Sequence, residues 1–114
     1  MIAVIFEVEM PDGHRPEYLS LAADLASDLA RVEGFISIER FESITRPGKL
    51  LSLSFWQDED AVRRWRGLES HRAAQRRGRE HVFSDYRLRV ATVVRDYGLT
   101  RRDEAPQDSR ERHG

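Results

Sequence analysis

The stretch "FISIERFESITRPGKLLSLSFW", residues 35–56, decides the fold. Residues 35–44 alternate between apolar and polar side chains, which is the period of a half-buried strand. "TRPGK" at 45–49 contains a Pro-Gly pair, which is typical of a turn, and "LLSLSFW" at 50–56 predicts the next strand. Two strands joined by so short a loop predict an antiparallel β-hairpin.

The chain before the hairpin predicts one strand and one helix. Residues 1–10 alternate along the strand period and place a set of apolar side chains on one face: Ile2, Val4, Phe6, Val8 and Met10. A turn at "PDGH" follows. From residue 15 to 32 the apolar positions recur at helical spacing. Pro16 is suited to the first helical turn and Gly34 to the helix end.

The chain after the hairpin predicts two short helices and a last strand. "DEDAVRRW" at 58–65 begins with acids, which stabilise a helix N-terminus. Gly67 interrupts this helix, and Ser70 is a candidate cap for a second helix from about residue 71 to 81. Within 83–97 a strand would place Tyr86, Leu88 and Val90 on one face and Arg87 and Arg89 on the other.

The resulting order, β-α-β-β-α-(α)-β, predicts an α+β, ferredoxin-like split β-α-β fold with a four-stranded antiparallel sheet and helices on one face. The second face of the sheet would carry apolar residues, including Ile5, Ala91 and Val93. A monomer avoids exposing such a patch, so we expect a symmetric homodimer that packs sheet on sheet. Shielding of this face by the strand arginines is the alternative.

Composition limits the number of domains, the kinds of partner and the chemistry that the chain can have. The 114 residues suit one domain, and a net charge of -1 gives no basic field that would call for nucleic acid. Cysteine is absent, which excludes thiolate chemistry. The first residues predict a strand rather than a signal peptide, and no apolar run is long enough for a membrane span, so we expect a cytoplasmic protein. Residues 99–114, polar and poor in apolar side chains, predict a disordered, mobile tail after a domain at 1–98.

The run from "FISIERFES" through "GKLLSLSFWQDEDAVRRWRGLESHRAAQRRG" to "VATVVRDYG" closely resembles the antibiotic biosynthesis monooxygenase family, over about residues 1–97. Its most recognisable segment is a strand with an aromatic end, an acidic helix start, Trp65 and, six residues later, His71. The resemblance implies a dimeric α/β barrel. Members of the family include cofactor-free oxygenases of quinol-like or anthrone-like molecules, haem-degrading enzymes and proteins of unknown activity.

The haem-degrading branch uses a strand Asn, a Trp and an iron-ligating His. An ungapped alignment from Phe55 matches the Trp to Trp65 but places Gln75 at the position of the iron ligand, where an amide is a poor haem ligand. The Asn would fall near residues 6–7, and this chain contains no asparagine. The resemblance therefore favours the cofactor-free branch, with haem as the alternative cofactor. The cofactor-free oxygenases carry an aromatic hydroxyl six residues after the Trp, where this chain has His71.

We therefore expect a cofactor-independent monooxygenase that oxidises a hydroquinone-like or anthrone-like aromatic substrate with dioxygen. His71 would be the base, Trp65 a stacking wall and Arg87 the group that stabilises the anion. Further residues are expected to contact the substrate: Trp56, Phe55, Phe83, Tyr86 and Gln75. A non-catalytic, ligand-binding dimer of the same fold remains open, because fold alone does not give function.

Each candidate also has a structural interpretation. Trp65 and the other aromatic residues are suited to a core, His71 to a cap or a buried hydrogen bond, and Arg87 to an ion pair. Strand parity leaves open which face lines the pocket. One of the two strand acids, Glu7 or Glu9, is expected to pair across the sheet with Arg87, Arg89 or Arg95. The spacing of His, Asp and Glu predicts no metal site.

Overall fold

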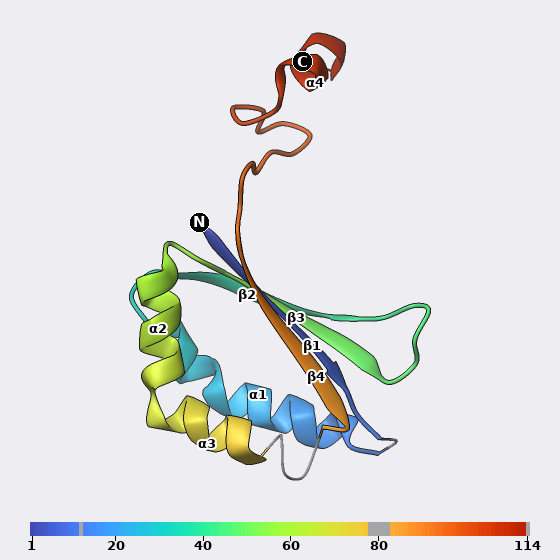
Figure 1. Ribbon diagram of the computed structural model, residues 1–114, viewed down its shortest axis with the longest axis vertical. Helices are drawn as coiled ribbons and strands as arrows, with labels where there is room; N and C mark the ends of the chain where they lie inside the picture. Colours follow the sequence, from blue (N-terminus) through green and yellow to red (C-terminus); the bar gives the residue numbers. More distant parts are fainter. Residues whose placement is uncertain (12, 78–82, 114) are drawn as a thin grey trace.

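A four-stranded antiparallel sheet, with helices across one face, forms the body of the computed structural model, which describes residues 1–11, 13–77 and 83–113 (Figure 1). The strand order is β2-β3-β1-β4. The strands are β1 (Ile2–Glu9), β2 (Phe35–Glu42), β3 (Lys49–Trp56) and β4 (Asp85–Thr92). The helices are α1 (Arg15–Ala30), α2 (Glu59–Gly67), α3 (Glu69–Arg77) and α4 (Gln107–His113). The predicted ferredoxin-like α+β fold, built around the hairpin β2–β3, is confirmed.

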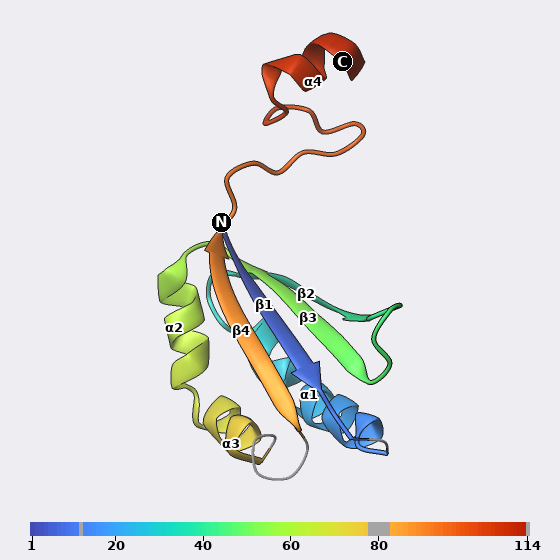
Figure 2. The same ribbon diagram turned by 45° about the vertical axis from the view of Figure 1, so that its right-hand side comes forward.

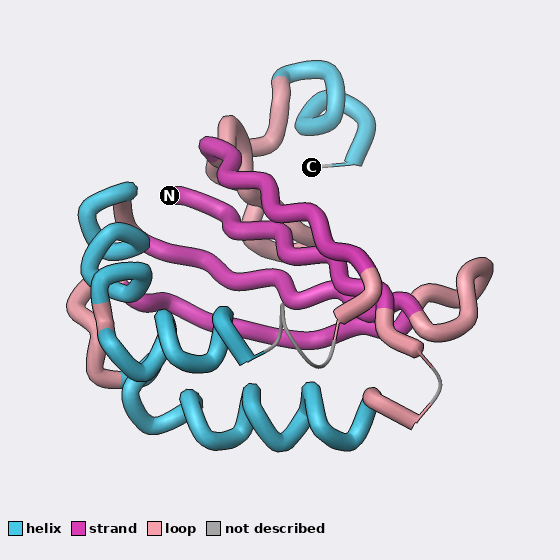
Figure 3. The backbone as a smooth tube through the Cα atoms, turned by 60° about the horizontal axis from the view of Figure 1, so that its bottom comes forward, coloured by secondary structure: helices cyan, strands magenta, loops and turns pink. Residues whose placement is uncertain are grey.

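The register of the sheet settles which side chains share a face. Phe6 on β1 lies opposite Ser52 on β3 and Leu88 on β4, whereas Glu7 lies opposite Leu51 and Arg87. The face that carries Phe6 is covered by α1, α2 and α3, of which α1 and α3 lie side by side beneath the sheet (Figure 3). We call the other side, which carries Glu7, the open face.

Local sequence explains how α2 begins next to the hairpin. The Asp58 carboxylate accepts a hydrogen bond from the Ala61 backbone N–H at 2.9 Å and so caps the helix. Gly34, before β2, has a φ of +91° and lies so close to Ala61 that an added Cβ would stand 2.7 Å from the Ala61 Cβ. Only glycine meets both conditions without strain. The second predicted cap is wrong, since α3 begins at Glu69, one residue before Ser70.

The core consists of two apolar clusters at opposite ends of the covered face. One surrounds Trp56, which is 1% exposed, and includes Ile2 and Leu29. The other surrounds Val8 and includes Tyr18. Both clusters pack the sheet against α1. The sheet and α1 therefore form one rigid unit around the space between the two clusters.

The tail differs from the expectation of a segment without structure. It leaves β4 beside the N-terminus and ends in α4, apart from the sheet (Figure 2). Polar contacts, rather than an apolar core, organise it: the Arg102 guanidinium donates to the Gly98 carbonyl and to the Ser109 hydroxyl. Sequence patterning missed α4 because hydrophobic periodicity does not report such contacts. Within the described residues, every helix is too short or too polar to cross a membrane.

Candidate functional site

A cavity of about 190 Å³ lies between the covered face of the sheet and the helices. Two rows of side chains that run across all four strands form its sheet side. The first row is Ile38, Ser54, Val4 and Val90, and the second is Arg40, Ser52, Phe6 and Leu88. On the helix side, α1 contributes mainly aliphatic side chains, and α2 and α3 contribute Trp65, Arg66 and His71. The site is therefore apolar with a few polar groups, which is typical of a small-molecule pocket.

Trp65 and His71 meet at the junction of α2 and α3. Leu68 has an extended conformation, with φ -68° and ψ 138°, and separates the two helices. The bend brings the two rings together, with their centroids 4.6 Å apart and their planes at 55°. Trp65 also packs at 6.4 Å against Trp56. The Trp65 side chain therefore both packs on the core and lines the cavity.

The electrostatics of His71 favour a neutral ring. Burial lowers the pKa of His71 below its usual 6.5, and the positive charge of Arg66 lowers it further. Within the described part of the chain, no hydrogen bond to the His71 ring is found. Its nitrogen lone pair is thus available at neutral pH to accept a proton from a molecule in the cavity.

The structure does not bring Arg87 or Phe55 to the cavity. Arg87 is paired in register with Glu7, and Phe55 with Ala3, which places both residues on the open face. The physical reason is the period of the strand: neighbouring residues point to opposite faces. Two other arginines line the cavity instead, Arg66 from α2 and Arg40 from β2.

Local sequence patterns do not indicate that these two arginines line the cavity, for different reasons. Arg66 is one of many arginines in residues 63–79, a stretch whose pattern favours a solvated helix face. Arg40 is assigned to the covered face only by the register of the hairpin, in which it lies opposite Ser52. Local sequence patterns therefore identify neither arginine as a cavity residue.

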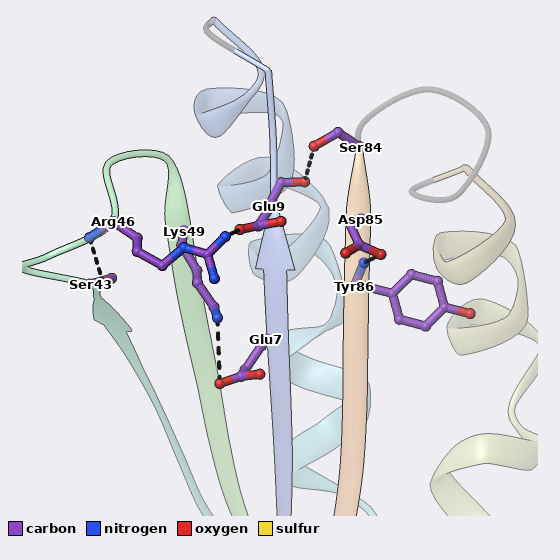
Figure 4. A network of polar contacts seen from close by, with 8 residues as sticks. All are labelled: Glu7, Glu9, Ser43, Arg46, Lys49, Ser84, Asp85 and Tyr86. Carbon is purple, nitrogen blue, oxygen red and sulfur yellow. Dashed lines mark hydrogen bonds and ion pairs between the residues drawn. The ribbon is translucent and has the colours of Figure 1, made fainter.

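Charged pairs occupy one end of the open face (Figure 4). Glu7 contacts Lys49 at 3.7 Å and Arg89 at 2.9 Å, and the hydrogen bond from Arg89 is the main reason why the pKa of Glu7 is lowered. Glu9 pairs with Arg46 at 2.6 Å. The expectation that one strand acid pairs with a strand arginine is confirmed by Glu7 and Arg89. Both Glu7 and Glu9 form ion pairs on the face away from the cavity.

The other predicted contact residues have mixed positions. Trp56 and Phe83 line the cavity. Tyr86 lies on the covered face and packs against Phe83 with ring centroids 6.3 Å apart, just outside the lining. The side chain of Gln75 is outside the described residues, as is the end of the second helix that was predicted to reach residue 81. Among the residues that the structure describes, no group of three or more His, Asp or Glu is arranged to hold a metal ion.

Comparison with known proteins identifies relatives of this chain. The model of the antibiotic biosynthesis monooxygenase family matches residues 1–77. The jasmonate monooxygenase ABM of Pyricularia oryzae is 46% identical over 94 residues, which are 82% of this chain and 44% of that protein. The chain therefore spans less than half of that relative. The uncharacterised protein YqjZ of Bacillus subtilis is 32% identical over 93 residues, which are 82% of this chain and 79% of that protein.

A solved structure shows the same fold. It is a variant of SnoaB, a cofactor-independent oxygenase from Streptomyces nogalater, with a TM-score of 0.72 and 17% identity. The superposition covers 83% of this chain and 94% of that one. At this identity the likeness supports the architecture alone.

Proposed function

We propose that this chain, which belongs to the antibiotic biosynthesis monooxygenase family, is a monooxygenase that oxidises a small, electron-rich aromatic molecule with dioxygen and without a bound cofactor. The observation that carries the proposal is the contact of Trp65 with a neutral His71 at the wall of an apolar cavity. A neutral imidazole beside a flat apolar surface is the arrangement needed to deprotonate a phenol or an enolisable ring that stacks there.

Deprotonation is the step that the protein must supply. The anion is electron-rich enough to transfer an electron to dioxygen, which a neutral phenol does poorly. For an anthrone-like substrate, the ring methylene becomes a carbonyl that keeps one oxygen atom, and the other oxygen atom leaves as water with the two hydrogens removed. This balance needs no external reductant. His71 would accept the first proton, Trp65 would orient the ring, and the charge of Arg66 would stabilise the anion.

The size of the cavity suits a small ring system. A cavity of about 150 Å³ binds benzene, so the 190 Å³ found here accommodates at least a substituted single ring. The name of the Pyricularia oryzae relative assigns jasmonate to that protein, and jasmonate therefore belongs in any substrate panel.

Dioxygen uptake by the purified full chain, with no cofactor added, tests this function. The panel would contain hydroquinones, anthrones and jasmonate, and we expect uptake with at least one hydroquinone or anthrone. Uptake that appears only after haemin or reduced flavin is added would contradict the cofactor-free proposal. Binding of panel members without uptake under any condition would instead support a non-catalytic binding dimer.

We also propose that two copies associate through the open face of the sheet. Its strands β1 and β3 present half-buried apolar side chains, Ile5, Leu51, Leu53 and Phe55, and a second copy would cover them. Leu53→Glu would place an unpaired carboxylate in this contact. The expected result is a change from dimer to monomer in light scattering after size exclusion. Leu19→Glu, on an exposed position of α1, is the matched control and should stay dimeric; a Leu53→Glu variant that also stays dimeric would contradict the interface.

A further inference from the structure

The cavity has a positive lining without a compensating acid. Its charged residues are Arg40, Arg66 and the titratable His71, and neither aspartate nor glutamate is among the described residues that line it. Most other arginines on the sheet and α1 meet a carboxylate: Arg15 contacts Glu42 and Arg89 contacts Glu7, both at 2.9 Å. Arg40 and Arg66 are exposed residues, so water solvates them when the cavity is empty. An anionic ligand that displaces this water would balance their charge, whereas a neutral ligand would not.

Arg40 lines the cavity, and the acid nearest to it along β2, Glu42, forms an ion pair with another residue. Glu42 lies two residues further along β2, on the same face, but both of its oxygens accept hydrogen bonds from Arg15, at 2.9 and 3.2 Å. The contact found for the Arg40 guanidinium is with the Tyr18 ring, 6.0 Å from its centroid, and in the described part of the chain it has no ion pair. Stacking on an aromatic ring leaves the edge of a guanidinium, with its paired N–H groups, open to an anion.

Hydroxyl groups lie beside Arg40 on the sheet. Ser52 is directly opposite Arg40 in register, and it is only 7% exposed, with no hydrogen bond to its hydroxyl found among the described residues. Ser54, in the next row, accepts a hydrogen bond from the Trp56 indole at 2.9 Å, so its own O–H remains available as a donor. The β2–β3 side of the cavity therefore presents the donors Arg40, Ser52 and Ser54 beside the apolar Ile38 and Trp56. The β1–β4 side presents the apolar Val4, Phe6, Leu88 and Val90.

The cavity therefore has a polar end at β2 and β3 and an apolar end at β1 and β4, which would orient a ligand that has one polar end. We propose that the substrate of the proposed oxygenase carries a carboxylate, which binds Arg40 and the Ser52 hydroxyl, and that its apolar ring lies across β1 and β4 toward Trp65 and His71. Three strand spacings, about 14 Å in all, separate the Cα traces of β2 and β4, so the anion and the reacting ring occupy opposite ends of one molecule. Arg40 is then a specificity-determining residue, while Arg66 acts at the reacting end.

The substrate class rests on the proposed function, but binding alone tests it. The probes are 1-naphthaleneacetic acid and its primary amide, which have nearly the same shape and differ in charge at pH 7.5. Calorimetry on the full chain should give an affinity for the acid about tenfold or more above that for the amide, because charge-assisted bidentate hydrogen bonds are the strong ones. Added salt should weaken binding of the acid more than binding of the amide.

Three variants localise the preference. Arg40→Gln should abolish the preference for the acid and leave the affinity for the amide within about twofold. Arg40→Lys should restore part of the preference, since an ammonium supplies charge without the planar fork. Arg63→Gln is the matched control, because Arg63 is exposed on α2 and pairs with Asp60 at 2.7 Å; it should keep the full preference.

Specific outcomes would overturn the subsite: equal affinities for acid and amide in the unmodified chain, no binding of the acid at millimolar concentration, or a preference that survives Arg40→Gln. Dioxygen uptake is measured separately with uncharged hydroquinones. An intact oxygenase without acid preference refutes only the carboxylate subsite, and acid preference without uptake refutes only the oxygenase.

Discussion

His71→Ala should lower the rate of dioxygen uptake by about tenfold or more while the fold survives, because a positioned general base contributes roughly 10²–10⁴ to a rate. The substitution removes the ring that contacts Trp65 and the lone pair that would accept the substrate proton. Oxygen-electrode rates measured with the unmodified chain and the variant, at matched protein concentration, give the ratio. Circular dichroism and thermal unfolding show whether the variant is folded.

His71→Gln separates proton transfer from packing. Glutamine is polar and similar in reach to histidine but cannot act as a base near neutral pH, so it should be as inactive as alanine. Rates for both variants that match the unmodified chain would remove His71 from the reaction. A loss in the alanine variant that glutamine restores would indicate a packing role instead.

The pH dependence provides an independent readout of His71. Because its pKa is lowered by burial and by Arg66, the neutral ring persists below pH 6.5, and kcat/KM should fall only at pH values below that. The unfolded chain, with an ordinary histidine, binds a proton at higher pH than the folded chain does. The contribution of His71 to the free energy of unfolding is therefore fully present above pH 6.5. It is lost as the pH falls toward the lowered pKa of the folded state. Arg66→Gln should move the acid limb of the rate profile toward higher pH.

Local patterns in this sequence predict the fold, but they do not predict which charged residues line the cavity. The alternation at 35–56 and the turn at "TRPGK" predicted the hairpin, and each flanking element followed from its own period. Period 2 divides a strand into two faces without saying which one the helices cover. From the sequence alone, Arg87 is therefore as good a candidate for the cavity as a residue of the other face. The register places it opposite Glu7, on the open face.

The cavity also depends on contacts that no local pattern encodes. His71 contacts Trp65 because Leu68 is extended between two helices, and Arg66 lines the same cavity from the last turn of α2. The sequence shows only Gly67 as a helix breaker, which predicts an interruption but not its angle. The positions of Trp65 and His71 came from the family resemblance, and the structure shows how they come to line one cavity.

Trp56→Ala should lower the free energy of unfolding by about 3–5 kcal/mol, the range for removing a large aromatic side chain from a core. Trp56 is 1% exposed, packs edge-on against Phe35 with centroids 5.3 Å apart, and donates its indole N–H to Ser54. Removal would enlarge the cavity that Trp56 helps to line and would leave the buried Ser54 hydroxyl without its donor. Urea unfolding at a fixed protein concentration measures the loss.

Trp65→Ala is the matched comparison, since Trp65 is only half-buried and lies at the cavity wall. It should cost less stability than Trp56→Ala but weaken binding of aromatic probes more. The two rings pack 6.4 Å apart, so the double variant should lose a different amount of stability from the sum of the single losses. Equal stability losses in the single variants would contradict the division between a core tryptophan and a pocket tryptophan, because burial would then not distinguish them. The expected pattern is a larger stability loss in Trp56→Ala and a larger loss of ligand binding in Trp65→Ala. Of two rings in contact, Trp56 would then mainly stabilise the fold and Trp65 would mainly bind the substrate ring.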